Sequence, residues 1–187
     1  GLIQSIIVSG LYWPVMLAPL AFVFGMSFMI NRMSSGMAMA AFLAYALVNG
    51  ISFAVIFLAY TSTSIASTFL ITTMTFGFMF VLGWTTKRDL TSMGSLLMMA
   101  FFGLLAAMVV NMFLGSGMMS FIISIAGVLI FVGLTAWDAQ KLKQMSIYGF
   151  ANQDVEDKGA IMGALTLYLD FINIFLFLLR LMGGGRD

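Results

Sequence analysis

Residues 164–181 read ALTLYLDFINIFLFLLRL, an apolar segment that carries Asp170 near its middle. An acidic side chain at the centre of a membrane helix costs about 2.5–3.5 kcal/mol on insertion scales, so it usually faces a partner, a cavity or water. A second acidic residue, Asp138, adjoins another apolar segment within residues 135–141, TAWDAQK. We therefore treat Asp138 and Asp170 as the candidate pair on which function depends.

The composition excludes several classes of protein. Of the 187 residues 62% are hydrophobic and 8% are charged, whereas a soluble domain carries about 25% charged residues. The net charge of +1 provides no basic surface, so we expect no nucleic-acid partner. Cysteine and histidine are both absent, which removes disulfides, thiol chemistry and the usual nitrogen and sulfur ligands of zinc, copper or haem. We expect no tightly bound cofactor.

Long apolar segments with charges confined to the gaps between them are typical of membrane helices, which need about 20 residues to cross the hydrocarbon layer. The pattern predicts an all-α membrane protein in which residues 1–187 form a single transmembrane helical bundle. Residues 144–159 are interpreted as a solvated acidic connection. The six predicted spans cover approximately residues 11–30, 37–60, 65–84, 96–114, 121–137 and 161–182.

Basic residues occur in alternate connections between the predicted spans. Arg32 lies in the first connection, Lys87 and Arg88 in the third, and Lys141, Lys143 and Lys158 in the fifth. By the positive-inside rule these connections are cytoplasmic, and we interpret Lys87, Arg88, Lys141 and Lys143 as topology anchors. We therefore expect an integral, multi-pass membrane protein in which Arg32 and Asp138 lie at the same membrane face.

The residues around Asp170 predict a polar stripe on the last helix. Asn173 follows Asp170 by three positions and Thr166 precedes it by four, so the three side chains share one helix face. A polar stripe on such a helix is expected to point inward, away from lipid.

Asp138 and Arg32 each have two interpretations. Asp138 lies at the C-terminal end of its predicted helix, one turn after Thr135, where the macrodipole disfavours a carboxylate. It is either a solvated aspartate with Lys141 nearby, or it turns inward to meet Arg32, Asp170 or both. Arg32 is either a topology anchor or a partner of these carboxylates.

Two sequence segments resemble paired signatures of the Bax inhibitor family, also called the transmembrane Bax inhibitor motif family. They are residues 133–143, GLTAWDAQKLK, and residues 163–180, GALTLYLDFINIFLFLLR. Residues 85–90, TTKRDL, are similar to bacterial members. The resemblance covers nearly the whole chain and favours a bacterial plasma (inner) membrane protein.

The resemblance implies a helical bundle with a central C-terminal helix that acts as a pH-sensitive calcium leak. In the family, two aspartates form a hydrogen-bonded pair that senses protons, and an arginine latches to this pair. These roles correspond here to Asp138 and Asp170, and to Arg32 as the latch. The family pattern has seven spans, so we expect the chain to lack the first helix.

The physical mechanism that we expect starts from the two carboxyl groups. In a low-dielectric site they resist double ionisation, share a proton and titrate as a pair. Calcium prefers six to eight oxygen ligands, so Asp138 and Asp170, supported by the polar face of Thr135, Thr166 and Asn173, offer a sparse site. Weak and transient occupancy suits a permeant ion better than a stored one.

Two other functions remain open from the sequence. The chain could be a non-conducting regulator that binds a membrane protease or a cell-death factor, with the aspartates fixing helix packing. It could also be an intramembrane aspartyl protease, since two aspartates on neighbouring helices can act as acid and base. The glycine-aspartate signature of such a site is absent before Asp138 and Asp170, so we do not expect an enzyme.

Overall fold

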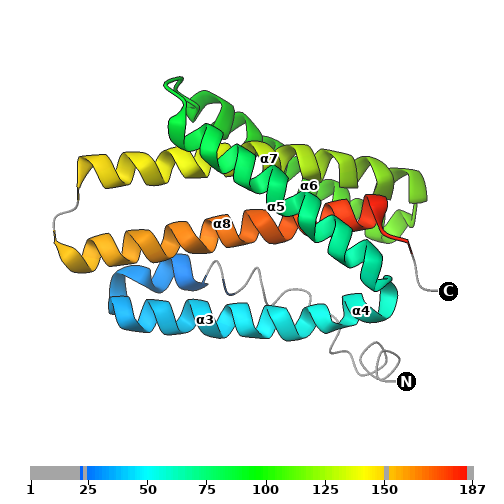
Figure 1. Ribbon diagram of the computed structural model, residues 1–187, viewed down its shortest axis with the longest axis horizontal. Helices are drawn as coiled ribbons and strands as arrows, with labels where there is room; N and C mark the ends of the chain where they lie inside the picture. The colour runs from blue at the N-terminus through cyan, green and yellow to red at the C-terminus, as the bar shows by residue number, and fades with distance from the viewer. Residues whose placement is uncertain (1–21, 23–24, 150–151, 185–187) are drawn as a thin grey trace. The chain divides into compact units, whose positions relative to one another are not determined.

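The computed structural model describes residue 22 and the ranges 25–149 and 152–184, and its elements in these ranges are helices. Short 3-10 turns, η1 (Ile30–Arg32) and η2 (Phe53–Val55), precede and follow α3. The α-helices are α3 (Ser35–Ser52), α4 (Ile56–Ala59), α5 (Ser62–Thr85), α6 (Thr91–Leu114), α7 (Gly117–Tyr148) and α8 (Gln153–Met182) (Figure 1). The all-α prediction is confirmed for the described chain.

Four of the predicted spans correspond to long helices. The spans over residues 65–84, 96–114, 121–137 and 161–182 are α5, α6, α7 and α8, each long and apolar enough to cross a membrane. The span over residues 11–30 falls largely outside the described residues. The predicted helix over residues 37–60 is instead interrupted after Ser52 by the 3-10 turn η2. The hydropathy pattern did not predict this break, because it registers apolar side chains and not backbone geometry.

The predicted acidic connection over residues 144–159 is too long. α7 continues to Tyr148 and α8 begins at Gln153, so most of this segment is helical. Local backbone signals set the two ends: Gly149, with φ of 70°, follows the last residue of α7, and Asn152 Oδ1 accepts a hydrogen bond from Val155 N. Charged residues mark where a helix leaves the apolar layer, and they do not end it.

The chain divides into two compact units, which we describe separately: residues 1–56 with 150–162, and residues 57–149 with 163–187. In the second unit α7 packs along both α5 and α6 (Figure 1). The core of this unit is apolar and contains residues of α6, α7 and α8. They are Leu104, Ile123, Ile130, Phe131, Leu134, Ile174 and Phe177.

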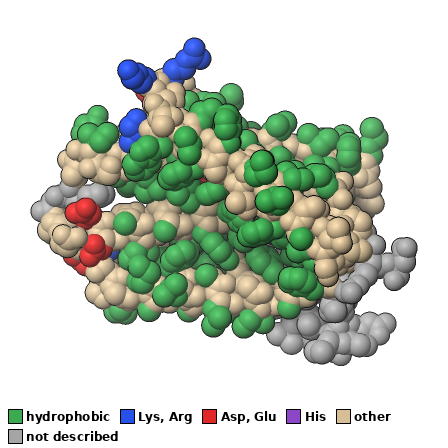
Figure 2. Space-filling view, in the orientation of Figure 1, with side chains coloured by type: hydrophobic (Ala, Val, Ile, Leu, Met, Phe, Trp, Pro, Cys, Tyr) green, Lys and Arg blue, Asp and Glu red, His purple; other side chains and the backbone are tan. Residues whose placement is uncertain are grey.

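Large apolar side chains remain exposed on the outer helix faces. Phe78, Leu96 and Leu129 are each more than half exposed, and hydrophobic side chains are spread over much of the face seen in Figure 2. Charged side chains gather there in a few places. Because an exposed apolar surface this extensive is unfavourable in water, these faces are suited to contact lipid.

A glycine allows α5 and α7 to approach closely. Gly83 of α5 is buried, and a methyl group built on it would overlap the backbone of Ala136 in α7. Ala136 is itself fully buried. Small residues at such a crossing bring helix backbones into contact, so this contact fixes α7 two residues before Asp138.

The side chain of Gln140 joins α7 to the connection between α5 and α6. Its Nε2 donates to the carbonyl of Arg88 at 2.8 Å, and its Oε1 accepts from the backbone N of Leu90 at 2.8 Å. The side chain is buried, and both of its polar groups have partners. This clamp holds α7 two residues after Asp138.

We predict that Gly83→Ala destabilises the protein by about 1–3 kcal/mol, because overpacking forces the two backbones apart. Gly77→Ala in the same helix is the matched control, since an added methyl group there meets nothing within 4 Å. It should be neutral or slightly stabilising, as alanine favours helix. Unfolding of both variants in detergent measures the difference, and equal midpoints would contradict the close crossing.

We predict that Gln140→Ala costs about 1–3 kcal/mol of stability, because it leaves the Arg88 carbonyl and the Leu90 N–H without their partner. Gln144→Ala is the control, because Gln144 is exposed one turn later on the same helix. Denaturant unfolding compares the two variants. A loss of stability as large in the control as in Gln140→Ala would show that the clamp contributes nothing specific.

Candidate functional site

Asp170 lies in the interior of α8 and is 3% exposed. The apolar residues Ile174 and Phe175 that follow it on the same helix are buried as well. Its Oδ2 is buried and has no hydrogen-bond partner in the described chain. Burying a polar atom without a partner is costly, so this atom is a candidate for binding a proton or a ligand.

Asp138 lies on α7 and is 7% exposed. The carboxyl groups of Asp138 and Asp170 are close enough to interact electrostatically and to share a hydrogen bond. Both residues belong to the second unit. The structure therefore brings together the two acidic side chains that the sequence singled out, and Asp138 is turned inward.

Lys141 contacts the exposed side of this pair. Its Nζ is 3.7 Å from Asp138 Oδ1, and the lysine side chain is 48% exposed while that of Asp138 is 10% exposed. The same Nζ lies 4.6 Å from the centroid of the Trp137 ring, within the range of a cation–π contact. Asp138 is therefore buried and not solvated, and Lys141 lies on its exposed side.

Two of the three predicted supporting residues, Thr135 and Asn173, hydrogen-bond within their own helices. Thr135 is fully buried, and its hydroxyl donates to the Phe131 carbonyl at 2.8 Å. Asn173 Nδ2 donates to the Leu169 carbonyl at 2.8 Å, and Thr166 is half-buried on the same helix. Thr135 and Asn173 therefore satisfy backbone carbonyls of α7 and α8, and their role in an ion pathway stays a prediction.

Arg32 belongs to the first unit, where it is the last residue of η1 and is exposed. The aspartate pair belongs to the second unit. The predicted latch between Arg32 and the pair therefore stays a prediction.

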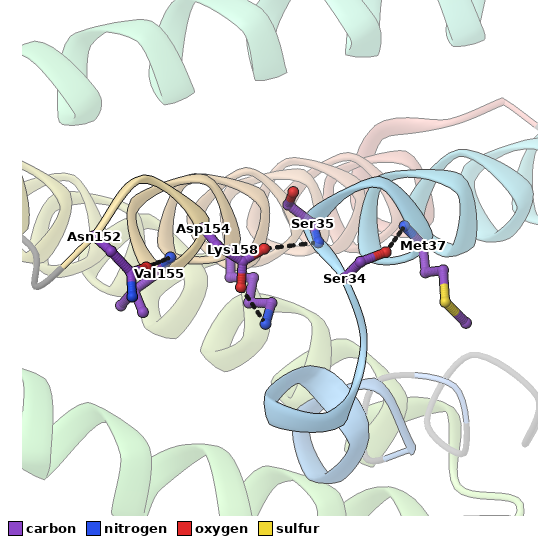
Figure 3. A network of polar contacts seen from close by, with 7 residues as sticks. All are labelled: Ser34, Ser35, Met37, Asn152, Asp154, Val155 and Lys158. Atoms are coloured by element: carbon purple, nitrogen blue, oxygen red, sulfur yellow. Dashed lines mark hydrogen bonds and ion pairs between the residues drawn. The ribbon is translucent and has the colours of Figure 1, made fainter.

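A polar network in the first unit joins the start of α8 to the start of α3 (Figure 3). Asp154 Oδ1 accepts from the backbone N of Ser35 at 3.2 Å, and Asp154 Oδ2 pairs with Lys158 Nζ at 2.6 Å. A carboxylate at a helix N-terminus is favourable because it accepts from free N–H groups. This part of the predicted acidic connection therefore has a structural role.

The acidic residues offer few ligands to a metal ion. Within the described ranges, no group of three or more acidic side chains is placed to hold a metal ion. Asp138 and Asp170 together supply four carboxylate oxygens at most, fewer than the six to eight oxygen ligands that calcium prefers. The arrangement is compatible with weak and transient cation binding.

Two residues of this region were not assigned to the candidate site from the sequence. Gln140 gave little signal, because its partners are backbone groups of residues distant in sequence. Lys141 was interpreted as a membrane anchor. The spacing of Lys141 from Asp138 and Trp137, three and four positions, was the available signal.

Comparison with known proteins places these observations in a family. Residues 2–187 match the family model described as inhibitor of apoptosis-promoting Bax1. The chain is 45% identical over 174 residues to the inner membrane protein YbhL of Escherichia coli, covering 92% of this chain and 74% of YbhL. It is 48% identical over 175 residues to an uncharacterised protein of Rickettsia prowazekii, covering 92% of this chain and 73% of that protein.

A third relative, an uncharacterised protein of Deinococcus radiodurans, is 44% identical over 180 residues, which cover 96% of this chain and 77% of that protein. The family match extends over both units and includes the helices that carry Asp138 and Asp170. These matches agree with the four long apolar helices and with apolar outer faces suited to lipid. The chain therefore belongs to the Bax inhibitor family and is a multi-pass membrane protein embedded in the lipid bilayer.

Proposed function

We propose that this protein is a pH-sensitive calcium leak channel whose gate is the proton-sharing pair Asp138 and Asp170, with Arg32 as a latch. The observation that carries the proposal is the interaction between two buried carboxyl groups on two long apolar helices. One oxygen of this pair, Asp170 Oδ2, is buried without a hydrogen-bond partner in the described chain. Intramembrane acidic residues of this kind mark ion and proton pathways.

The proposed bundle contains six spans, the first over residues 11–30, with α8 at its centre. The central position of α8 is supported by its share in the buried core, to which it contributes Ile174 and Phe177. The inner membrane location of YbhL supports a bacterial inner membrane as the site of action.

The proposed mechanism depends on how many protons the pair holds. Two carboxylates in low dielectric repel each other, so the arrangement with one shared proton is favoured over the doubly ionised one. Loss of that proton adds repulsion between α7 and α8, which biases a two-state helix arrangement. Calcium and protons are then the permeating and regulating ions, and no tightly bound cofactor takes part.

The alternative is a non-conducting regulator that binds another membrane protein. Both functions are compatible with a buried acidic pair, which can fix helix packing as well as gate a pathway. Purified protein in liposomes separates the two, because a leak that needs no partner favours the channel.

We predict that Asp170→Asn and Asp138→Asn each make calcium flux into liposomes independent of pH, because a single carboxyl group has no second carboxylate whose repulsion can act between α7 and α8 when the proton leaves. Asp89→Asn is the control. Hydrogen bonds from Thr91 hold the pKa of Asp89 below its ordinary value, so Asp89 remains ionised near neutrality. A wild-type pH profile in Asp170→Asn would show that Asp170 is not part of the pH sensor.

We predict that Arg32→Ala moves the midpoint of the flux profile toward higher pH by about one unit. A nearby cation favours the ionised carboxylate, so its removal lets the pair keep its proton to a higher pH. Lys87→Ala, an exposed cation of the α5–α6 connection, is the control. An unmoved midpoint in Arg32→Ala would leave Arg32 as a topology anchor only.

A further inference from the structure

Lys141 is held by two contacts at once. Its ammonium lies 3.7 Å from Asp138 Oδ1 and 4.6 Å from the Trp137 ring centroid. A charge-assisted hydrogen bond between nitrogen and oxygen is typically 2.7–2.9 Å long, so the contact with Asp138 is an ion pair without a tight hydrogen bond. An ion pair of this kind is weak and easily displaced.

Lys141 is also the outer member of the group. Its side chain is 48% exposed, whereas the side chain of Asp138 is 10% exposed and Asp170 is 3% exposed. The charged groups that act on Asp138 are Lys141 of the same helix and Asp170 of α8, and those that act on Asp170 are Asp138 and Lys141. Within the described second unit, Lys141 is therefore the cation that compensates the pair.

We propose that the ammonium of Lys141 is a tethered counter-cation that occupies the Asp138 carboxylate and must leave it before a multivalent metal cation can bind there. The proposal rests on the proposed function for the idea that cations reach this pair. Its geometric support is independent, because Lys141 lies against Asp138 while the buried Oδ2 of Asp170 has no hydrogen-bond partner in the described chain and is an unused ligand atom of the same pair.

The competition has a definite physical consequence. The site is free to bind a metal cation only in those molecules in which Lys141 has moved away. The apparent affinity for the metal cation is therefore the intrinsic affinity multiplied by the fraction of such molecules. The ammonium also repels an approaching cation from close range. Removal of the Lys141 charge should therefore strengthen binding of the metal cation. A cation that stays bound for longer should cross the membrane more slowly or block the pathway.

Binding can be measured without flux by using terbium, an oxygen-seeking trivalent cation whose luminescence is excited by a nearby tryptophan. The chain has 3 tryptophans, and Trp13→Phe with Trp84→Phe leaves Trp137 as the donor beside Asp138. In this background Asp138→Asn should abolish the saturable signal. A signal that persists in Asp138→Asn would place the bound cation elsewhere and would overturn the proposal.

We predict that Lys141→Met tightens terbium binding about threefold to tenfold, whereas Lys141→Arg, which keeps the charge, binds like the wild type. Lys143→Met is the matched control, because it removes the same charge two positions later on α7, and it should change affinity by no more than about twofold. Lys141→Gln provides a second neutral variant, and gel filtration verifies that each variant is folded. Equal effects of Lys141→Met and Lys143→Met, or no saturable binding in Lys141→Met, would overturn the proposal.

Calcium flux of the same variants separates this inference from the proposed function. If Lys141→Met binds terbium more tightly and no variant conducts calcium, the result supports the counter-cation role of Lys141 and contradicts the proposed channel function. If the wild type shows pH-dependent flux and all lysine variants bind terbium alike, the channel stands and the counter-cation role fails.

Discussion

The contact between two acidic side chains inside a hydrophobic helical protein is the constraint on which the rest of this structure depends. Asp138 and Asp170 are both buried, on α7 and α8. Such a site is unfavourable unless protons, counter-ions or close packing compensate it. The surrounding features of the second unit can each be understood as ways of holding these two groups in place.

α7 is fixed on both sides of Asp138. Two residues before it, Ala136 lies against Gly83 of α5, and two residues after it Gln140 binds the backbone of the α5–α6 connection. Both contacts involve backbone atoms, which leave little room for adjustment. A helix held this firmly around its carboxylate moves as a unit, so a change in repulsion within the pair would act on the whole of α7.

The sequence was sufficient for the helical class and for four long helices, because hydropathy is a local property. The structure buries both Asp138 and Asp170, and their role as the functional pair stays a prediction. The sequence was insufficient for the break after Ser52 and for the true ends of α7 and α8, which depend on backbone geometry at residues such as Gly149. The role of Gln140 was invisible because its partners are backbone atoms about fifty positions away. The contact of Lys141 with Trp137 was not foreseen, because a cation beside an apolar segment is usually a topology anchor.

Lys141 also offers a way to accommodate an acidic pair in the interior of two long apolar helices. With one shared proton the pair carries a single negative charge, and the ammonium beside Asp138 balances it. A neutral group of three costs less to bury than an isolated charge, and the half-exposed lysine stem lets the cation stay in contact with water. The exposed member of the group is thus the cation, and the two carboxyl groups are inside. This is the order required if the cation is to leave the site without disturbing the packing of α7 and α8.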